Sequence, residues 1–513
     1  MTLAELIAGA PVERIHGGAD VEISGLAYDS RRVRSGDLFF ATARDRAARR
    51  AHIEEALQRG ARAVAAREGA VEEARPAFTI LECAEPRAVM AVAAARFFGA
   101  PSRKIDLIGV TGTSGKTTST YLLASIFEAA GRPCGLIGTI GVFARGRKLQ
   151  SGLTTPESID FEAALAAMER EGVTAAAAEI SSIGIAERRV DQLSFAACLF
   201  TNLGRDHLDY HGTIAAYFEA KLRLFAELLP KSARPGAVAV ARGDHPYGAR
   251  VLAARLSRKV SFGLDRALDV YPESYRVGVE GIRATLNLMG RRCEISSPML
   301  GEINLLNILG ASAVSAALGI EPEAVAEGVR RCPGAPGRLE AVAGPQGVKV
   351  LVDYAHKPDA LEAVLGALRG LGPRRLICVF GCGGDRDRGK RPIMGAIAGR
   401  LADTAVLTSD NPRSEDPLAI IAEVEAGLAE CGLERISQTR AARGERGYVV
   451  EPDRRGGIAL ALRIAEPGDI VVVAGKGHED YQLVAGRRLD FDDRAVVREI
   501  VARMGVTEPA SRN

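Results

Sequence analysis

The sequence has almost no excess of charge of either sign. Its 513 residues include 67 lysines and arginines against 64 aspartates and glutamates, which leaves a formal net charge of +3. A chain that mainly neutralises the phosphate backbone of a nucleic acid carries a pronounced basic excess. The balance therefore argues against nucleic acid as a partner.

Closely spaced cysteine pairs are also missing. The eight cysteines are scattered, no CxxC pair occurs, and the nearest neighbours are Cys378 and Cys382. A zinc site would need further cysteines or histidines at ligand spacing, and a disulfide framework is typical of shorter secreted chains. The pattern predicts reduced thiols packed in the core.

Long apolar runs and tryptophan are absent too. No apolar stretch approaches the ~20 residues that a bilayer span requires. The opening MTLAELIAGAPVERIHGG (1–18) carries acidic residues where a signal peptide would have a basic start. With 47% hydrophobic and 26% charged residues, the composition predicts a soluble, cytoplasmic protein without membrane insertion.

The length and the pattern of apolar runs predict a multidomain α/β protein. A chain of 513 residues is too long for one core and suggests about three domains. From about residue 104, short apolar runs alternate with helix-like segments, which is typical of parallel α/β folding. The alternation restarts after the Pro/Gly-rich stretch 332–340. The predicted domains are 1–100, 101–335 and 336–513.

Polar residues follow nearly every predicted strand. The segments expected to contain strands are 104–110, 174–181, 195–203, 348–356, 374–384, 404–413 and 469–480. Open α/β sheets bind ligands at the carboxyl ends of their strands. The polar strand ends therefore indicate binding sites along these edges.

The strongest local motif is GVTGTSGKTTST (109–120). Backbone N–H groups around Gly112, Thr113 and Gly115 can cradle phosphates at the start of a helix predicted from Lys116 to about residue 130. Lys116 can reach the terminal phosphates, and the Thr117 hydroxyl can hold Mg²⁺. The motif departs from the common P-loop spacing because valine stands at 110, where the first glycine would be. It nevertheless predicts nucleotide binding.

Candidate metal-binding side chains follow two further strands. Glu179 ends one predicted strand, and His207 lies just past another in FTNLGRDHLDYHG (200–212). A carboxylate and a histidine near a P-loop suit metal ions bound to phosphates. A single histidine, however, is more often structural, and Lys221 in YFEAKLRLF (217–225) is by itself best explained as a solvated helix lysine.

Ten motifs in order resemble those of the Mur ligases. They are TGTSGKTTS (111–119), LTTPE (153–157), EISS (179–182), FTNLGRDHLDYHG (200–212), YFEAK (217–221), GEINLLN (301–307), DYAHKPDAL (353–361), GCGGDRDRGKRPIMG (381–395), SDNPRSEDP (409–417) and AGKGHEDYQ (474–482). The resemblance extends from Asp29 to Arg494 and includes the offset glycine of the P-loop.

The resemblance implies a uridine nucleotide domain, a central ATPase and a C-terminal Rossmann-like domain that recruits an amino acid. It implies a ligase of peptidoglycan precursor synthesis, with ATP as co-substrate and Mg²⁺ as cofactor, and we expect the protein to be a monomer. In such enzymes ATP converts a substrate carboxylate to an acyl phosphate, which the incoming amine then attacks. The implied reaction adds meso-2,6-diaminopimelate to UDP-N-acetylmuramoyl-L-alanyl-D-glutamate.

Residue roles follow from the same resemblance. The implied ATP-binding residues are Gly112, Thr113, Ser114, Gly115, Lys116, Thr117, Thr118, Asn304, Arg338, Asp353 and His356. Those for the uridine-linked substrate are Ser30, Thr154, Thr155, Ser181, Glu187 and Arg189. Metal ions would be held by Thr117, Glu179, His207 and Lys221 as a carbamate; Lys116, Lys221, Glu179 and His207 would be catalytic. Carbamylation would turn the lysine into an anion near Mg²⁺.

The implied amino-acid site consists of Arg386, Asp410, Asn411, Pro412, Arg413, Gly475 and Glu479. In the family, Asp-Asn-Pro-Arg marks enzymes that add meso-diaminopimelate. Arg413 can clamp the distal carboxylate through its planar fork, and Arg386 can take the carboxylate near the reacting amine. Asn411 can supply a neutral hydrogen bond, while Glu479 and Gly475 receive the ammonium. Lysine has no distal carboxylate and would leave Arg413 unpaired.

Three features depart from the family pattern. Ile183 stands where the family usually has histidine, Glu187 stands where relatives often have glutamine, and RDRAARRAHI (44–53) replaces the usual segment that touches the uridine nucleotide. Because the P-loop, Lys221 and the C-terminal motifs are intact, we expect an active enzyme.

Two other interpretations remain open. One is a related ligase that adds L-lysine or another amino acid, or a folyl-polyglutamate synthetase. The other is a P-loop switch or motor, for which a basic stripe would be expected.

Overall fold

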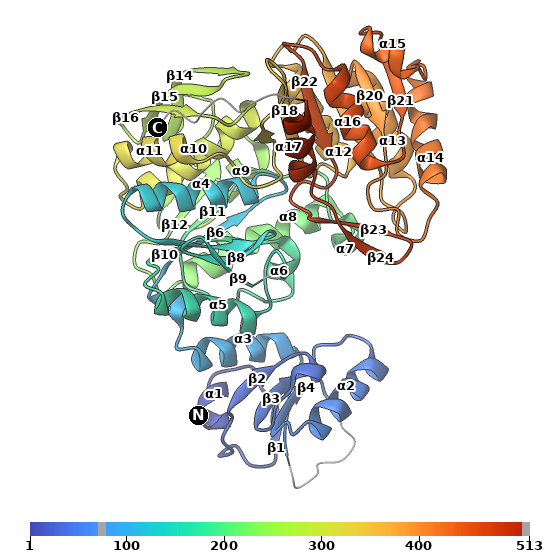
Figure 1. Ribbon diagram of the computed structural model, residues 1–513. Helices are drawn as coiled ribbons and strands as arrows, with labels where there is room; N and C mark the ends of the chain where they lie inside the picture. Colours follow the sequence, from blue (N-terminus) through green and yellow to red (C-terminus); the bar gives the residue numbers. More distant parts are fainter. Residues whose placement is uncertain (70–77, 151, 505–513) are drawn as a thin grey trace. The chain divides into compact units, whose positions relative to one another are not determined.

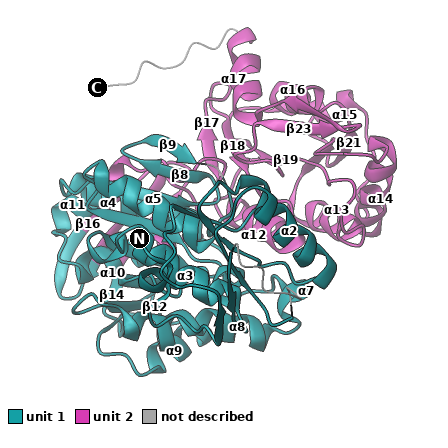
Figure 2. Cartoon of the chain, turned by 90° about the horizontal axis from the view of Figure 1, so that it is seen from below, with its two compact units in different colours: residues 1–272, 287–293, 308–328 teal, residues 273–286, 294–307, 329–513 magenta. Residues whose placement is uncertain are grey.

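The computed structural model describes residues 1–69, 78–150 and 152–504, which form two compact units (Figure 2). The first unit comprises residues 1–272, 287–293 and 308–328; the second comprises 273–286, 294–307 and 329 onward. The strands labelled in Figure 1 belong to three larger sheets and one two-stranded hairpin. The fold is α/β with parallel-rich sheets, so the predicted fold class is confirmed.

The first sheet belongs to the amino-terminal segment and has the strand order β1-β5-β4-β3-β2. Its strands are β1 (Arg14–His16), β2 (Gly25–Ala27), β3 (Asp37–Phe40), β4 (Ala63–Ala66) and β5 (Thr79–Glu82). The helices are α1 (Leu3–Ile7), α2 (Arg46–Gln58) and α3 (Pro86–Phe97). Apolar residues of α1 and α3 pack with one set of strand residues, while Ile53 and Ala56 of α2 pack with another. Helices therefore cover both faces.

The central sheet has the order β16-β15-β14-β13-β12-β11-β6-β10-β7-β8-β9. Its strands are β6 (Asp106–Thr111), β7 (Cys134–Gly138), β8 (Gly141–Ala144), β9 (Arg147–Gln150), β10 (Ala175–Glu179), β11 (Phe195–Phe200), β12 (Val238–Arg242), β13 (Lys259–Phe262), β14 (Val270–Gly278), β15 (Gly281–Leu288) and β16 (Arg291–Ser297). The helices are α4 (Lys116–Ala129), α5 (Ser158–Arg170), α6 (Ser182–Ala186), α7 (Leu208–His211), α8 (Ile214–Arg223), α9 (Pro246–Ala253), α10 (Glu302–Ala317) and α11 (Pro322–Arg331). Strands β13, β12, β11, β6, β10 and β7 are mutually parallel.

Strand β10 shows how burial overrides local preference. Its sequence AAAAE favours a helix by propensity, yet every residue is buried between β6 and β7. The small side chains allow both faces of the strand to be covered. This places Glu179, its last residue, beside the end of β6.

The third sheet has the order β17-β18-β22-β19-β20-β21. Its strands are β17 (Glu340–Val342), β18 (Lys349–Asp353), β19 (Leu376–Phe380), β20 (Thr404–Leu407), β21 (Gly447–Val450) and β22 (Ile470–Ala474), and a separate hairpin is formed by β23 (Tyr481–Val484) and β24 (Arg487–Asp490). The helices are α12 (Pro358–Arg369), α13 (Lys390–Leu401), α14 (Pro417–Glu430), α15 (Gln438–Ala442), α16 (Arg454–Ile464) and α17 (Asp493–Arg503). Helices α12–α14 and α15–α17 contribute to separate apolar clusters, as expected for a doubly wound sheet.

The strands and helices predicted from the sequence are present. Each of the seven predicted segments contains a strand, and α4 begins at Lys116 as predicted. Seven of the eight cysteines are buried, and Cys431 is half-buried, so the prediction of core thiols is largely confirmed. Within the described ranges, no helix is long and apolar enough to cross a membrane.

Candidate active site

The loop between β6 and α4 has the backbone of a phosphate-binding loop. Gly112 and Gly115 have φ angles of 150° and 85°, which favour glycine. A Cβ added at Gly112 would lie 2.0 Å from Thr201 Oγ1, so a side chain does not fit there. The loop opens onto the amino terminus of α4, where unpaired N–H groups and the helix dipole favour an anion.

Two residues that directly follow β11 hold this loop through hydrogen bonds. Asn202 Oδ1 accepts from the Ser114 N–H at 3.0 Å, and the Thr201 hydroxyl donates to the Ser114 carbonyl at 2.7 Å. Lys116 Nζ donates to the carbonyl oxygens of Gly112 (2.8 Å) and Thr113 (2.9 Å). Its ammonium therefore lies against the loop that would receive the phosphates.

Glu179 lies next to the first turn of α4, as the order of β6 and β10 in the sheet requires. Its carboxylate accepts from the Thr117 hydroxyl at 3.0 Å and from the Thr139 N–H at 2.8 Å. Glu179 is buried, with 1% of its surface exposed. The two residues expected to serve the metal are thus in direct contact. Thr139 was not predicted from the sequence, although it follows strand β7 in the same sheet.

Lys221 is buried, and the interpretation as a solvated helix lysine is wrong. Only 1% of its surface is exposed, and Nζ lies 2.9 Å from the Gly112 carbonyl oxygen and 4.6 Å from the centre of the Tyr217 ring. Burial, and secondarily the charge of Lys116, hold the pKa of Lys221 well below its ordinary value. A neutral amine is the form that reacts with carbon dioxide, so this environment suits carbamylation.

His207 lies at the start of α7 in a left-handed backbone conformation with φ of 52°. Its Nε2 is 3.4 Å from an Asp206 carboxylate oxygen, and its ring centre is 6.1 Å from that of Tyr217. Tyr217 also contacts Lys221 and the Thr113 hydroxyl. The structure therefore brings His207 into the neighbourhood of the P-loop and Lys221.

Another histidine contacts the segment that departs from the family pattern. His211 Nε2 lies 2.9 Å from the Ser182 hydroxyl, directly before Ile183. Burial lowers the pKa of His211. Ile183 cannot make such a contact itself, and His211 supplies the polar partner on that turn.

Three hydroxyl residues predicted to bind the uridine-linked substrate lie beside Glu179. The Thr154 hydroxyl is 3.1 Å from the Thr139 hydroxyl, and the Thr155 hydroxyl donates to the Glu179 carbonyl at 2.8 Å. Ser181 N–H donates to Thr155 Oγ1 at 2.9 Å. These residues form one polar edge at the end of β10.

Glu187 connects that edge to the amino-terminal segment. Its carboxylate is paired with Arg44, lies 2.7 Å from Arg87 Nη1 and accepts from the Tyr210 hydroxyl at 2.7 Å. Burial opposes its charge, but Tyr210 and the two arginines outweigh that effect and lower the pKa of Glu187. Arg44, from the unusual 44–53 segment, therefore contacts the central sheet domain, which sequence reasoning missed.

Arg189 belongs to the same charge network. Glu157 lies between Arg87 and Arg189, with N–O distances of 3.2 and 3.1 Å, and Arg189 Nη1 donates to the Thr155 carbonyl at 3.1 Å. The network holds the Arg189 guanidinium next to the hydroxyl edge. Ser30, in the amino-terminal sheet domain, is buried and donates from its hydroxyl to Glu55 at 2.6 Å.

The remaining residues predicted to bind ATP lie in the second unit. Asp353 accepts N–H donors from Leu339 and Ala355 at 2.7 and 2.8 Å, and burial raises its pKa. Arg338 lies 4.8 Å from the centre of the Tyr354 ring. These contacts fix the residues at the end of β18.

His356 and Asn304 complete that group. His356 Nδ1 is 2.8 Å from the Tyr354 carbonyl oxygen, and burial lowers its pKa. The Asn304 amide donates to the Leu300 carbonyl at 2.8 Å within the start of α10.

The residues predicted to bind the amino acid gather at the carboxyl ends of β19, β20 and β22. Asn411 Nδ2 donates to Glu479 at 3.0 Å, and a Cβ at Gly475 would lie 3.7 Å from the Asp410 carboxyl carbon. Sequence reasoning missed Lys476, although AGKGHEDYQ contains it. Its fully buried Nζ lies 3.2 Å from Glu479 and 3.8 Å from Asp410.

The two arginines of this site lie on adjoining loops. Arg413 has a φ of 54°, and its Nη1 donates to the Gly384 carbonyl at 2.7 Å. A Cβ at Gly383 would lie 2.9 Å from Arg413 Nη1 and 3.8 Å from Arg386 Cγ. Arg386 is exposed, and Pro412 is buried. The structure thus places Arg413 close to the loop of Gly383 and Gly384, while Arg386 lies on that loop with an exposed side chain.

Comparison with known proteins decides the family. Residues 110–315 match the Mur ligase middle domain, and residues 337–477 match the domain described as Mur ligase, glutamate ligase domain. A UDP-N-acetylmuramoyl-L-alanyl-D-glutamate--2,6-diaminopimelate ligase from Geobacter metallireducens is 43% identical over 94% of both chains. The chain belongs to the Mur ligase family. The resemblance found in the sequence is therefore confirmed.

Other relatives agree over nearly the whole length. A ligase of the same name from Solibacter usitatus is 42% identical, covering 98% of this Mur ligase and 99% of the relative. A solved structure of a 2,6-diaminopimelate ligase superposes with a TM-score of 0.70 at 31% identity, covering 99% and 100% of the two chains. A folylpolyglutamate synthase from Mycobacterium tuberculosis, at 19% identity and a TM-score of 0.58, shares the fold.

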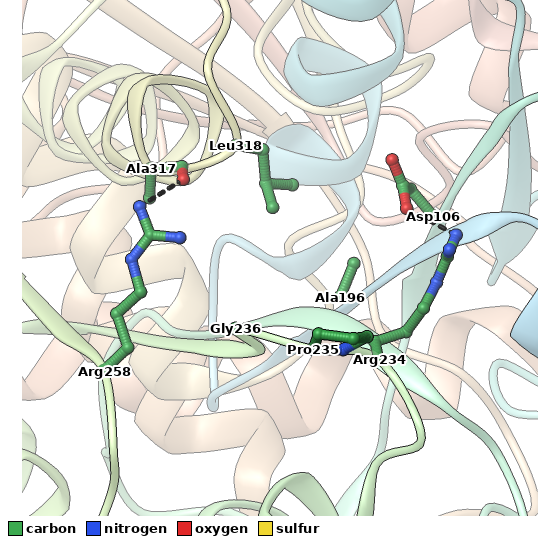
Figure 3. Close-up of a pocket in the computed structure, with 8 residues that line it drawn as sticks. All are labelled: Asp106, Ala196, Arg234, Pro235, Gly236, Arg258, Ala317 and Leu318. Atoms are coloured by element: carbon green, nitrogen blue, oxygen red, sulfur yellow. Dashed lines mark hydrogen bonds and ion pairs between the residues drawn. The ribbon is translucent and has the colours of Figure 1, made fainter.

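One cavity lies away from these residues. It has a volume of about 350 Å³ and is lined by Asp106, Ala196, Arg234, Pro235, Gly236, Arg258, Ala317 and Leu318 (Figure 3). Asp106 begins β6, whereas the P-loop follows the end of that strand. The Asp106 carboxylate is paired with Arg234, and Arg258 donates to the Ala317 carbonyl at 2.7 Å. The cavity therefore lies at the amino-terminal end of β6, whereas the P-loop follows the carboxyl-terminal end of that strand.

Proposed function

We propose that this Mur ligase joins meso-2,6-diaminopimelate to the γ-carboxylate of the D-glutamate in UDP-N-acetylmuramoyl-L-alanyl-D-glutamate, with ATP converted to ADP and phosphate. The names of the relatives support this substrate pair. The observation that carries the proposal is the grouping of Asp410, Glu479 and Arg413 at adjoining strand ends. At these strand ends the two carboxylates would bind the distal ammonium of diaminopimelate, and Arg413 would bind its distal carboxylate.

The charges of that group agree with a zwitterionic end. Asp410 Oδ1 is buried, lies 3.8 Å from Lys476 Nζ and has no hydrogen-bond partner in the part of the chain that the structure describes. It can accept from a substrate ammonium, since a buried carboxylate oxygen without a donor is costly. Arg413 can bind the carboxylate through two parallel N–H groups. The distal end of L-lysine has an ammonium but no carboxylate, so L-lysine would leave Arg413 without a carboxylate partner.

The reaction requires a better leaving group than oxide. The substrate carboxylate oxygen attacks the γ-phosphorus of ATP, the bond to the β-γ bridging oxygen breaks, and ADP leaves. The amine of diaminopimelate then attacks the acyl carbon, the tetrahedral species expels phosphate, and the amine loses a proton. Lys116 and the α4 amino terminus stabilise the phosphoryl charge, and Arg189 binds the anionic substrate.

The metal-binding residues suit Mg²⁺. Among the described residues, no group of three or more histidine, cysteine, aspartate and glutamate side chains is arranged to hold a metal. Mg²⁺ typically uses one or two protein carboxylates together with substrate phosphates and water, and Glu179, in contact with the Thr117 hydroxyl at 3.0 Å, can supply such a carboxylate. Thr117, Glu179, His207 and carbamylated Lys221 would hold it. When bound, Mg²⁺ neutralises charge on the phosphoryl group.

The proposal also includes the roles of the three domains, the cellular location and the oligomeric state. Residues 1–100 bind the uridine nucleotide, 101–335 bind ATP and 336–513 bind the amino acid. The enzyme acts in the cytoplasm, where ATP is available, and as a monomer. Its molar mass in solution, from light scattering, should match the 54.2 kDa of one chain.

A competition assay tests the function. The protein should release phosphate from ATP only when both the muramoyl-dipeptide substrate and an amino acid are present. With meso-diaminopimelate, L-lysine and L-ornithine supplied together, the product should contain diaminopimelate. Preferential incorporation of L-lysine would assign the protein to the lysine-adding ligases. ATP hydrolysis that is independent of both substrates would favour a switch or motor.

A further inference from the structure

A fully buried ion pair lies beneath the residues proposed to bind diaminopimelate. Arg454 begins α16 and Asp493 begins α17, and neither side chain has any exposed surface. Arg454 Nε and Nη2 donate to the two Asp493 oxygens at 2.8 and 2.7 Å. The desolvation cost of a buried pair can exceed its attraction, so stability alone is a weak reason for such a pair.

The rest of the guanidinium reaches two different loops. Nη2 also donates to the Ala474 carbonyl at 3.0 Å, and Nη1 donates to the Ser409 carbonyl at 3.3 Å. Ala474 is directly followed by Gly475, and Ser409 by Asp410. Strands β22 and β20, which these loops follow, are not neighbours, because β19 lies between them in the sheet.

We propose that Arg454 is a positioning residue for the amino-acid site, whose guanidinium holds the loops beginning at Asp410 and Gly475 at a fixed distance from each other. The inference rests on the proposed function, since it assigns those loops to diaminopimelate. With no exposed surface, Arg454 acts through the loops and does not touch the substrate. The Asn411–Glu479 hydrogen bond of 3.0 Å is the part of the site that this spacing sets.

The geometry requires arginine. The planar guanidinium directs N–H groups to the Asp493 carboxylate on one side and to two backbone carbonyls on others. Lysine has three donors on a single nitrogen and cannot reach acceptors in these separate directions. Asp493 balances the charge, so the effect on the site is one of distance rather than of net charge.

The same domain contains a matched control pair. Arg375 Nε and Nη2 lie 3.0 and 2.6 Å from Asp469 Oδ2, with side-chain exposures of 8% and 0%. These residues directly precede β19 and β22, at the amino ends of strands whose carboxyl ends carry the site. A change there disturbs a comparable buried pair but not the loops.

Steady-state kinetics of the full-length enzyme can separate positioning from folding. Arg454→Lys should raise the KM for meso-diaminopimelate roughly tenfold or more, because the two loops that bind it would shift. A displacement of about 1 Å in an active site can lower the reaction rate up to a hundredfold. The KM for ATP should stay within about threefold, since the hydrogen bonds of Arg454 reach neither the P-loop nor Asp353 and His356. Arg375→Lys should lower the melting temperature to a similar extent while both KM values stay at the native level.

Several results would overturn the inference. One is a parallel rise of both KM values in Arg454→Lys, and another is the same KM pattern in Arg375→Lys. If Arg454→Lys does not fold, Arg454→Met combined with Asp493→Leu replaces both buried charges with apolar side chains, and the same KM comparison decides. A native enzyme that does not consume diaminopimelate would refute the proposed function itself, whereas an active native enzyme with an unchanged KM in the variants would refute only the role of Arg454.

Discussion

Lys221 Nζ lies 2.9 Å from the carbonyl oxygen of Gly112, the residue that begins the tight turn of the P-loop. A lysine from a helix that starts about a hundred residues later therefore contacts the P-loop directly. Its amine is buried and its pKa is lowered mainly by that burial. An uncharged amine in this position is prepared for reaction with carbon dioxide, and the resulting carbamate would supply an anion close to the phosphate loop.

Replacing Lys221 by alanine should nearly abolish ligation while the fold is retained. The substitution removes the group that becomes a carbamate, and a small carboxylic acid added at millimolar concentration should restore part of the activity by replacing that anion. Phosphate release in the presence of all substrates measures both effects. Lys104→Ala is the control, because Lys104 is 56% exposed and paired with Glu169 on the surface. Near-native activity of Lys221→Ala would remove the carbamate from the mechanism.

Alanine at position 112 should disable the phosphate loop. Its Cβ would lie 2.0 Å from Thr201 Oγ1 and 3.1 Å from the Asn202 nitrogen, so the loop must move away from β11. We expect the KM for ATP to rise by about tenfold or more. Gly131→Ala, at the other end of α4, is the matched control because Gly131 also has a positive φ of 71° but no atom within 4 Å of an added Cβ. That variant should lose about 1 kcal/mol of stability, because alanine is strained at a positive φ, and keep its KM. Equal KM effects in both variants would show that backbone strain alone is responsible.

Local sequence was sufficient to predict the P-loop and the strand ends, because both depend on short-range signals. Glycine at positions of positive φ and a lysine at the helix start specify the loop, and apolar runs bounded by polar residues specify β18, β19, β20 and β22. The family resemblance supplied the roles of Glu179 and Arg413. The positions of these residues at the strand ends could therefore be predicted largely from the sequence, whereas their roles are part of the proposed function.

Tertiary contacts could not be predicted in the same way. Lys221 shares a helix face with the buried residues Tyr217 and Phe218, but that apolar face alone does not show that the amine reaches the P-loop, 109 residues earlier in the chain. Glu187 and Arg44 are 143 residues apart, and Arg454 and Asp493 are 39 apart. Each arginine is ordinary for a helix or a loop in isolation. Only the three-dimensional structure shows that each arginine is paired with a distant carboxylate.

Arg413→Ala should weaken binding of the amino acid far more than that of ATP. A hydrogen-bonded contact between arginine and a carboxylate contributes on the order of 1.5–3 kcal/mol, so the KM for diaminopimelate should rise about tenfold or more. Arg413→Lys should recover little, because a single ammonium cannot form two parallel hydrogen bonds. Arg455→Ala, which removes a 45%-exposed arginine paired with Glu499, should leave both KM values unchanged. Equal increases in the two KM values for Arg413→Ala would place the arginine outside the amino-acid site.

Glu162, on α5, makes the stability of the first unit depend on pH. Its side chain is almost fully buried, and neither carboxylate oxygen has a hydrogen-bond partner among the residues that the structure describes. Burial raises the pKa of Glu162 to about 8, and the charge of Arg103 offsets this only in part. In the unfolded chain the same carboxyl has a pKa of about 4.3.

The sign of the effect follows from proton binding. Between about pH 4.3 and pH 8 the folded protein retains a proton on Glu162 that the unfolded chain has lost, so the free energy of unfolding falls as pH rises through this window and levels off above it. Glu162→Gln keeps the shape without the titration and should be more stable than the native protein at pH 8, with a flatter profile of melting temperature against pH. Glu169→Gln on the same helix, where the carboxylate is partly exposed and paired with Lys104, should keep the native slope. An unchanged slope in Glu162→Gln would mean that Glu162 is ionised in the folded protein and that burial does not govern its charge.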